Sequence, residues 1–447
     1  MRYLPHSHNE RQQMLNSIGI DCVDELFASI PKSAIKQRQF DLPNHKGEFL
    51  VAQHLGDLAK KNISANDVPF FIGAGAYHHH VPASVDHLIQ RSEWLTAYTP
   101  YQPEISQGTL QALFEFQTQV ATLMGMDIAN ASMYDGSTAT AEAALMAKRI
   151  TRRKKIILSG GLHPQYRDVV HTYLDNGKDL ITLDSTPDGH GDILSQIDEQ
   201  TAAIIVQTPD YFGSLRDVKQ LADAAHEKGA LLIVVITEII SLGLLEAPGN
   251  LGADIVVAEG QSLGNSLNFG GPYLGLLATR AKFTRQLPGR LCGQTIDSAG
   301  RRSFTLTLST REQHIRREKA TSNICTNAGL CALAFSIHLT LLGGTGLTKL
   351  AKLNHKMARK LASELNKIPN IKVLNNSFFN EMIVRLPKSA EQIVNNLAKK
   401  NILAGVPLSR LEPDNEQVEN LLILAATELT SSKDIATLCQ ALTEELL

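Results

Sequence analysis

Short runs of uniformly apolar residues alternate with amphipathic segments between about residues 155 and 278. The apolar runs have the length of strands, and the segments between them have helical periodicity. Strands that are apolar on both faces are typical of a parallel sheet covered by helices on each side. We therefore predict a large doubly wound α/β domain. The expected strands are Lys155–Leu158, Leu180–Leu183, Ala202–Val206, Leu231–Ile236, Ile255–Ala258 and Tyr273–Ala278, and the expected helices between them are His163–Leu174 and Leu215–Lys228.

The two ends of the chain have different patterns. Near the N-terminus, Ser7 and Glu10 form a capping box before a helix that Gly19 ends. We predict an N-terminal helical arm (1–70), the large α/β domain (71–330) and a small C-terminal α+β domain (331–447). Further helices are expected at Val23–Ser29, Gly47–Lys61, Leu347–Asn366, Ala390–Lys399 and Ser432–Leu446, and further strands at Ile371–Leu374, Met382–Leu386 and Leu421–Ala425.

Charge and hydropathy exclude several classes of partner. The 447 residues include 43 basic and 45 acidic side chains, and a net charge of −2 gives no basic surface for nucleic acid or an anionic membrane. The first residues have no long apolar run after Arg2, so we expect no signal peptide. Since no window approaches about 18 uninterrupted apolar residues, we expect no membrane span and a cytoplasmic location.

Cysteine and histidine patterns do not predict a metal centre. The five cysteines are widely scattered and include no C-x-x-C pair, so we expect reduced thiols and neither zinc nor a disulfide framework. The run His78-His79-His80 cannot direct three consecutive side chains the same way from a strand or helix. Polar contacts in a loop are the better interpretation of this run.

Three polar segments could carry function. Tyr134–Thr138 opens a helix, where Asp135 or Ser137 could act as an ordinary N-cap or free N–H groups could hold an anion. Glu259–Pro272 is polar and glycine-rich and follows a buried strand, where parallel-sheet enzymes place their chemistry. Tyr98–Glu104 contains two prolines, which suits a stiff segment facing a pocket or interface, or a rigid connector.

Five long motifs lie in order along most of the chain. They are F-I-G-A-G-A-Y-H-H-H-V-P-A at Phe71–Ala83, T-P-Y-Q-P-E-I-S-Q-G at Thr99–Gly108, Y-D-G-S-T-A at Tyr134–Ala139, E-G-Q-S-L-G-N-S-L-N-F-G-G-P-Y-L-G at Glu259–Gly275, and R-E-K-A-T-S-N-I-C-T at Arg317–Thr326. Together they resemble the alpha subunit (subunit 1) of the split glycine dehydrogenase (decarboxylating), the P-protein of the glycine cleavage system. The length also suits a half-size P-protein.

This resemblance implies a pyridoxal-phosphate enzyme fold of the aspartate-aminotransferase type, in a heterotetramer of glycine catabolism. It implies a partner beta subunit that holds pyridoxal 5'-phosphate, glycine as the substrate, and transfer of an aminomethyl group to lipoylated H-protein. The residues that we expect at the shared active site or interface are Tyr98, Tyr101, Gln102, Glu104, Ser137, Asn265, Ser266 and Asn268.

The residues themselves bear on where the coenzyme lies. Enzymes of this fold take their Schiff-base lysine from just after a late strand of the large domain. Here no lysine occurs between Lys228 and Lys282, so we expect no cofactor-binding and no catalytic lysine in this chain. Glu238 stands where relatives carry Asp-Pro, and His78 where they tend to carry Asp, which weakens a chemical role for either side chain. The alternatives are a free-standing pyridoxal-phosphate enzyme, which the missing lysine disfavours, and a silent scaffold that only stabilises its partner.

Overall fold

The computed structural model describes residues 5–35, 40–174, 179–187 and 193–446, and the chain divides into two compact units, Met1–Asn62 and Ile63–Leu447. None of the described residues of the first unit is buried. The predicted capping box of Ser7 and Glu10 is present, and Gly19 ends the helix in the left-handed region at φ 83°. The helices of this unit are α1 (His8–Ile18), η1 (Val23–Phe27), η2 (Lys32–Ala34) and α2 (Glu48–Ala59).

The second unit contains a seven-stranded sheet in the order β1-β7-β6-β5-β4-β2-β3. Strands β2 to β6 are parallel, as predicted, whereas β7 runs antiparallel to both β6 and β1. The doubly wound, mostly parallel α/β class is confirmed. The strands are β1 (Ile128–Ala129), β2 (Lys155–Leu158), β3 (Leu180–Thr182), β4 (Thr201–Gln207), β5 (Leu231–Ile236), β6 (Ile255–Glu259) and β7 (Gly275–Thr279).

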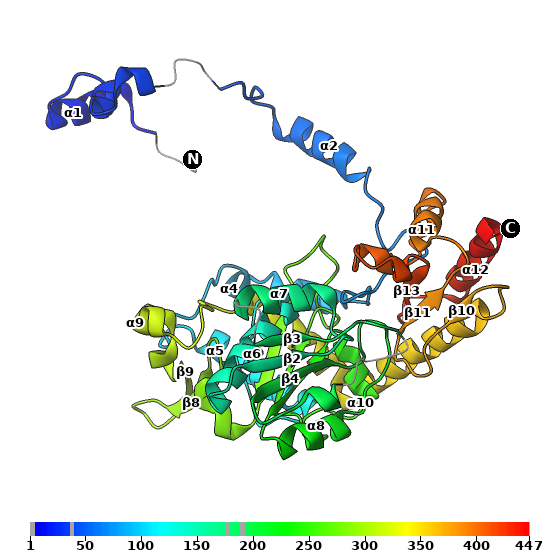
Figure 1. Cartoon of the computed structure of the whole chain (residues 1–447). Helices are drawn as coiled ribbons and strands as arrows, with labels where there is room; N and C mark the ends of the chain where they lie inside the picture. Colours follow the sequence, from blue (N-terminus) through cyan, green and yellow to red (C-terminus); the bar gives the residue numbers. More distant parts are fainter. Residues whose placement is uncertain (1–4, 36–39, 175–178, 188–192, 447) are drawn as a thin grey trace. The chain divides into compact units, whose positions relative to one another are not determined.

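Helices cover both faces of this sheet, because successive residues of each strand point to opposite sides. Val234 and Val256 pack with α5 and α8 on one face, while Val235 and Val257 pack with α6 and α7 on the other. Figure 1 shows α7 and α8 on opposite sides of the strands. The helices are α5 (Gln107–Met124), α6 (Gly136–Thr151), α7 (Pro164–Leu174) and α8 (Val218–Glu227), preceded in the chain by the short helices α3 (Ala83–Ile89) and α4 (Ser92–Leu95).

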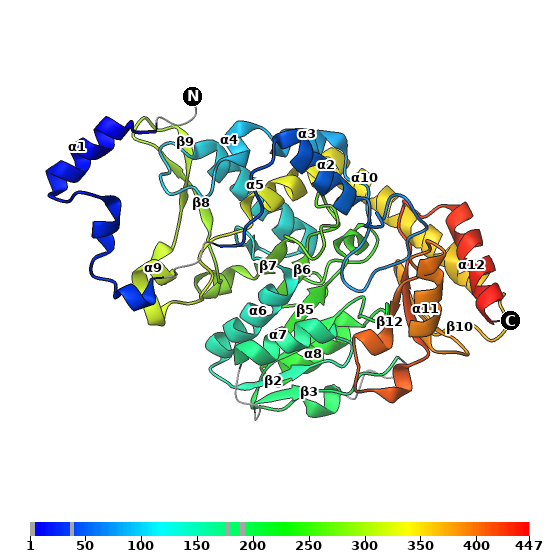
Figure 2. The same ribbon diagram turned by 90° about the horizontal axis from the view of Figure 1, so that it is seen from above.

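A four-stranded antiparallel sheet in the order β10-β11-β13-β12 follows in the C-terminal part. Two helices and a long connecting helix accompany it, and Figure 2 shows the connecting helix α10 running from near α5 to the small sheet. The elements are α10 (Gly329–Leu365), β10 (Lys372–Val373), β11 (Glu381–Arg385), α11 (Ala390–Lys399), β12 (Val406–Pro407), β13 (Leu421–Ala425) and α12 (Ser432–Leu446).

Helix α10 corrects one prediction. The helix expected from Leu347 is the second arm of an element that begins at Gly329 and bends at Gly343, where φ is 58° and ψ −179°. Among the described residues, only α10 has the length and hydropathy of a membrane-spanning helix. It packs into two hydrophobic cores of the second unit, for example through Phe335 and Leu361, and a core helix has the same properties.

A two-stranded hairpin, β8 (Cys292–Ile296) with β9 (Arg302–Leu306), was not predicted, because its residues are mostly exposed or half-buried and lack an apolar run. A short helix, α9 (Gln313–Arg316), follows it. The remaining elements are 3-10 helices: η3 (Leu194–Gln196), η4 (Ile239–Gly243), η5 (Ala281–Gln286), η6 (Ser309–Arg311), η7 (Arg317–Lys319), η8 (Leu408–Arg410) and η9 (Glu416–Val418). The predicted domain boundaries after residues 70 and 330 stay predictions.

Candidate functional site

The carboxyl ends of the parallel strands bring polar side chains to one edge of the large sheet, as this topology requires. His163 follows β2, Asp210 follows β4, Glu238 follows β5 and Gln261 follows β6. All four side chains are buried. The candidate site is therefore an enclosed polar cluster beneath other parts of the chain.

Residues Phe71–His80 cross this edge, and we call them the crossing segment. The carbonyl of Ala74 lies 3.1 Å from Nε2 of His163. Further along, the N–H of Tyr77 donates to Oε1 of Gln261 at 3.0 Å, and Nε2 of Gln261 donates back to the carbonyl of Tyr77 at 3.1 Å. The crossing segment is thus bonded to the ends of two strands of the sheet.

Within the crossing segment, His79 contacts two carboxylates. Its Nε2 lies 2.8 Å from Oε2 of Glu238, and its Nδ1 lies 2.8 Å from Oε2 of Glu428. Burial alone would lower the pKa of His79, but the two carboxylates outweigh burial and raise that pKa to about 10. Burial alone would raise the pKa of Glu428, but the His79 imidazolium outweighs burial and lowers that pKa to about 2. The three side chains form a buried cation between two anions.

Glu381, at the start of β11, holds the same segment from the small sheet. Its Oε1 accepts from the N–H of Ala74 at 2.5 Å, and its Oε2 accepts from the hydroxyl of Tyr77 at 2.9 Å. Burial raises the pKa of Glu381 to about 7. A Cβ atom at Gly73 would lie 2.2 Å from Oε1 of Glu381, so only glycine fits there.

The start of α6 has an ordinary N-cap, which is one of the two interpretations that the sequence allowed for Tyr134–Thr138. Asp135 is the N-cap, and its Oδ1 accepts from the N–H groups of Ser137 at 2.8 Å and of Thr138 at 2.9 Å. The N–H of Gly136 donates to Oε2 of Glu259 at 2.9 Å. Burial raises the pKa of Glu259 to about 8. The first N–H groups of the helix are therefore satisfied by the chain's own carboxyl groups.

A cavity of about 640 Å³ opens beside this helix start. Its wall includes three tyrosines and the neutral His163, whose pKa burial lowers to about 4. Among the described residues that line it, none is a lysine or an arginine. The polar residues of its wall are Tyr134, Asp135, Ser137, His163, Gln165, Tyr166, Glu259 and Tyr273.

The residues predicted for the shared site lie mainly on the surface. Tyr98 is 73% exposed and Tyr101 70% exposed. Gln102, Glu104, Ser266 and Asn268 are exposed as well, while Ser137 and Asn265 are half-buried. Ser137 is bonded to the Asp135 carboxylate through both its N–H and its hydroxyl.

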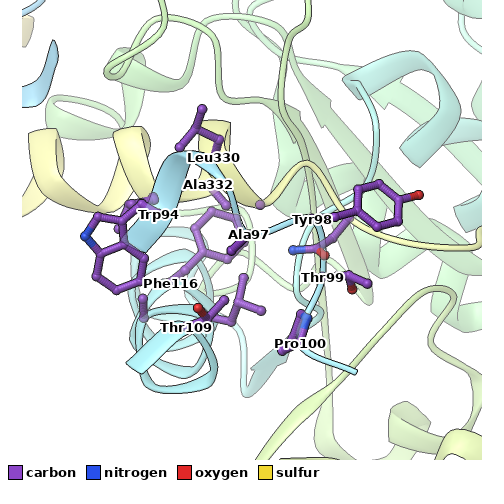
Figure 3. A pocket seen from close by; sticks show the side chains of 14 residues that line it. Trp94, Ala97, Tyr98, Thr99, Pro100, Thr109, Phe116, Leu330 and Ala332 are labelled. Carbon is purple, nitrogen blue, oxygen red and sulfur yellow. The ribbon is translucent and has the colours of Figure 1, made fainter. Parts of the chain in front are cut away.

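Parts of the two predicted segments, residues 98–100 and Asn265, lie near the start of α10. Nδ2 of Asn265 lies 3.4 Å from the carbonyl of Cys331. Residues 98–100 line a small apolar pocket together with Trp94, Phe116, Leu330 and Ala332. Figure 3 shows the Tyr98 ring extending away from Trp94 and Phe116. The structure thus brings residues 98–100 and Asn265 to the start of α10, and Ser137 belongs to the cavity at α6.

Sequence reasoning missed several members of the buried cluster. Glu381 and Glu428 carry no motif, and the only available signal was a carboxylate at the edge of an apolar strand. His78 lies 3.0 Å from Oδ1 of Asn66, a polar loop contact of the kind expected for the histidine run. The part of the chain that the structure describes contains no group of three or more His, Cys, Asp or Glu placed to hold a metal ion.

Comparison with known proteins shows which family the chain matches. The model of the family described as "Glycine cleavage system P-protein" matches residues 1–442. A protein of Beijerinckia indica subsp. indica named "Probable glycine dehydrogenase (decarboxylating) subunit 1" is 59% identical over 447 residues and covers 100% of both chains. One of the same name from Caulobacter vibrioides is 55% identical over 446 residues, with 99% of both chains covered.

Solved structures agree with the fold. A crystal structure of glycine decarboxylase (P-protein) of the glycine cleavage system, in inhibitor-bound form, has a TM-score of 0.91 and 44% identity, with 100% of both chains covered. A sphingosine-1-phosphate lyase from Burkholderia pseudomallei has a TM-score of 0.67 and 15% identity over 93% of this chain and 94% of that chain. The second likeness is one of fold alone.

Proposed function

The chain belongs to the glycine cleavage system P-protein family, and from this premise we propose that it is the subunit of a heteromeric glycine dehydrogenase (decarboxylating) that does not hold the coenzyme. The relatives named subunit 1 match it over its full length, which supports one subunit of an oxidoreductase of glycine catabolism. A beta subunit is the proposed partner. We expect the complex in the cytoplasm.

The residues of this chain do not fit pyridoxal phosphate. The coenzyme brings a phosphate anion, a pyridinium nitrogen and an aldehyde that reacts with a lysine. Here the sequence after β6 offers Gln261, whose amide is bonded to Tyr77, and no lysine lies between Lys228 and Lys282. At α6 the N–H groups that suit a phosphate already face Asp135 and Glu259. These contacts support the proposal that the coenzyme lies in the partner.

In the partner, the coenzyme would supply the electron sink for loss of CO2 from glycine. The task proposed for this chain is to form part of the pocket wall, exclude water and help to dock the lipoyl arm of H-protein. The surface beside the start of α10 supports this task, because Tyr98 and Asn265 lie there. Phe269, next to the predicted loop, is 97% exposed.

That exposed surface is the observation that carries the proposal. Large aromatic side chains held in water are typical of a face that a partner covers. Tyr98, Tyr101 and Phe269 meet this description, with exposed fractions of 73%, 70% and 97%. A scaffold that only stabilises its partner would bury the same aromatic face but would tolerate changes of the polar residues.

The test of coenzyme placement is borohydride reduction of the assembled complex, followed by peptide mapping. The proposal predicts the pyridoxyl-lysine in the beta subunit alone. A modified lysine in this chain at stoichiometric yield would contradict it. The scaffold alternative is tested separately by the polar substitutions described in the Discussion.

A further inference from the structure

We propose that this chain fills its own coenzyme cleft with its own charges: the imidazolium of His79 pairs with the carboxylate at the end of β5, and the carboxyl groups of Asp135 and Glu259 cap the helix start that would face a phosphate. The crossing segment is then an internal plug that closes the cleft to pyridoxal phosphate. The inference deepens the proposed function and rests on it in taking the coenzyme to lie in the partner.

At the cationic end of the plug lies the imidazolium of His79. A pyridinium N–H and an imidazolium N–H make the same interaction, a charge-assisted hydrogen bond to a carboxylate. Nε2 of His79 makes that bond to Oε2 of Glu238 at 2.8 Å, and Nδ2 of Asn380 donates to the same oxygen at 3.1 Å. Oε1 of Glu238 accepts from the N–H of Ile240 at 3.1 Å. Both oxygens of Glu238 are therefore engaged within the chain.

The anionic end of the cleft lies at the start of α6. A phosphate at the start of α6 would need the N–H groups of Gly136, Ser137 and Thr138, and each already donates to a carboxyl oxygen of the chain. Bringing a phosphate there would break these hydrogen bonds and place it beside the Asp135 carboxylate, with no lysine or arginine among the described lining residues to offset the repulsion.

The plug also joins the small sheet to the large one. His79 pairs with Glu428, which follows β13, as well as with Glu238. The N–H of His80 also donates to Oε1 of Glu428 at 2.7 Å. Because each carboxylate would be left buried and unpaired without the imidazolium, the plug holds the small sheet against the large one. A fixed arrangement suits a subunit that offers a wall to its partner.

Chemical rescue of the full-length chain tests the cationic end. His79→Gly removes the ring and leaves a ring-sized space between two buried carboxylates. We expect the melting temperature to fall by several degrees, and added imidazole at pH 6 to restore most of that loss. Imidazole should leave the wild-type chain unchanged. Benzene, which is similar in size and uncharged, should not rescue the variant.

His338→Gly is the matched control. His338 is also buried, but among the described residues its Nδ1 has no hydrogen-bond partner, and burial lowers its pKa to about 4, so it is a neutral ring. Imidazolium should not rescue this control. Should His79→Gly fail to accumulate as folded protein, refolding from urea with and without imidazole gives the same readout.

The anionic end is tested by equilibrium dialysis with inorganic phosphate. The wild-type chain should bind none, whereas Asp135→Ser combined with Glu259→Gln, which keeps a capping oxygen and removes both carboxyl groups, should gain at least tenfold in affinity. The inference is overturned if His79→Gly melts like the wild type, if benzene rescues it as well as imidazole, or if the wild-type chain binds phosphate as tightly as the double variant. None of these measurements depends on glycine turnover, so the proposed function can fail independently.

Discussion

Nε2 of His79 lies 2.8 Å from Oε2 of Glu238, and both side chains are buried. Glu238 is one of the positions where the sequence departs from related subunits, and the departure had suggested that the side chain does no chemistry. The structure gives it a definite partner instead. The pair joins the crossing segment to the end of β5, in the region where coenzyme-holding relatives of this fold place their chemistry.

The first prediction concerns stability against pH. Because the pKa of folded His79 is about 10 and the ordinary value is 6.5, the stabilisation from its charge is complete below pH 6.5 and is lost as the pH rises towards 10. His79→Gln should cost about 3 kcal/mol or more near neutral pH, as expected for breaking a buried ion pair. The difference from wild type should shrink between pH 8 and pH 10 in urea unfolding. A difference that does not change over this range would contradict the assignment.

The second prediction concerns the shared pocket. Tyr101→Phe and Asn265→Ala, tested in the assembled complex, should each lower glycine turnover roughly tenfold or more, or about 1.4 kcal/mol in the activation barrier. Asn376→Ala is the matched control, since Asn376 is an exposed amide between β10 and β11. Full activity in both pocket variants with intact assembly would favour the scaffold alternative.

The third prediction concerns the close packing of the crossing segment. Gly73→Ala would place a Cβ atom 2.2 Å from Oε1 of Glu381 and 2.7 Å from Cβ of Ala425. Overpacking of this kind costs about 1–3 kcal/mol. Gly344→Ala is the control, because a Cβ atom there meets nothing within 4 Å. Thermal unfolding should separate the two variants, and equal melting temperatures would show that the segment yields without cost.

The fourth prediction concerns the partner-facing surface. The isolated chain should self-associate, because Phe269, Tyr98 and Tyr101 expose large aromatic side chains. Phe269→Asp should reduce that self-association and weaken binding to the beta subunit at least tenfold, about 1.4 kcal/mol. The interface in the complex should exceed about 2,000 Å². Light scattering and titration measure these effects, and unchanged affinity in Phe269→Asp would place the interface elsewhere.

Much of the fold could be predicted because strands buried in a parallel sheet are continuous apolar runs in the sequence. Leu231–Ile236 is a strand with the bounds predicted for it. The two-residue strand β1 and the antiparallel direction of β7 could not be predicted, since the direction of a strand depends on connections that leave no local pattern. The helix predicted from Leu347 proved to be only part of α10, which begins at Gly329 and bends at Gly343.

The candidate site was only partly predictable, for a similar reason. Asp135 was recognised as a possible cap from residues that lie beside it in the chain. The partners of His79, in contrast, are 159 and 349 residues away in sequence. A single sequence carries no signal that pairs such distant positions, so the histidine run gave only a loop contact.

The central claim is that this chain completes a glycine decarboxylase whose coenzyme lies in its partner. The most direct test is exchange of the glycine carboxyl group with labelled bicarbonate. Each subunit is purified alone and then mixed with the other in the presence of lipoylated H-protein and pyridoxal phosphate. Exchange that appears only in the mixture is the predicted result. Exchange by the beta subunit alone at the full rate, or by this chain alone, would contradict the account.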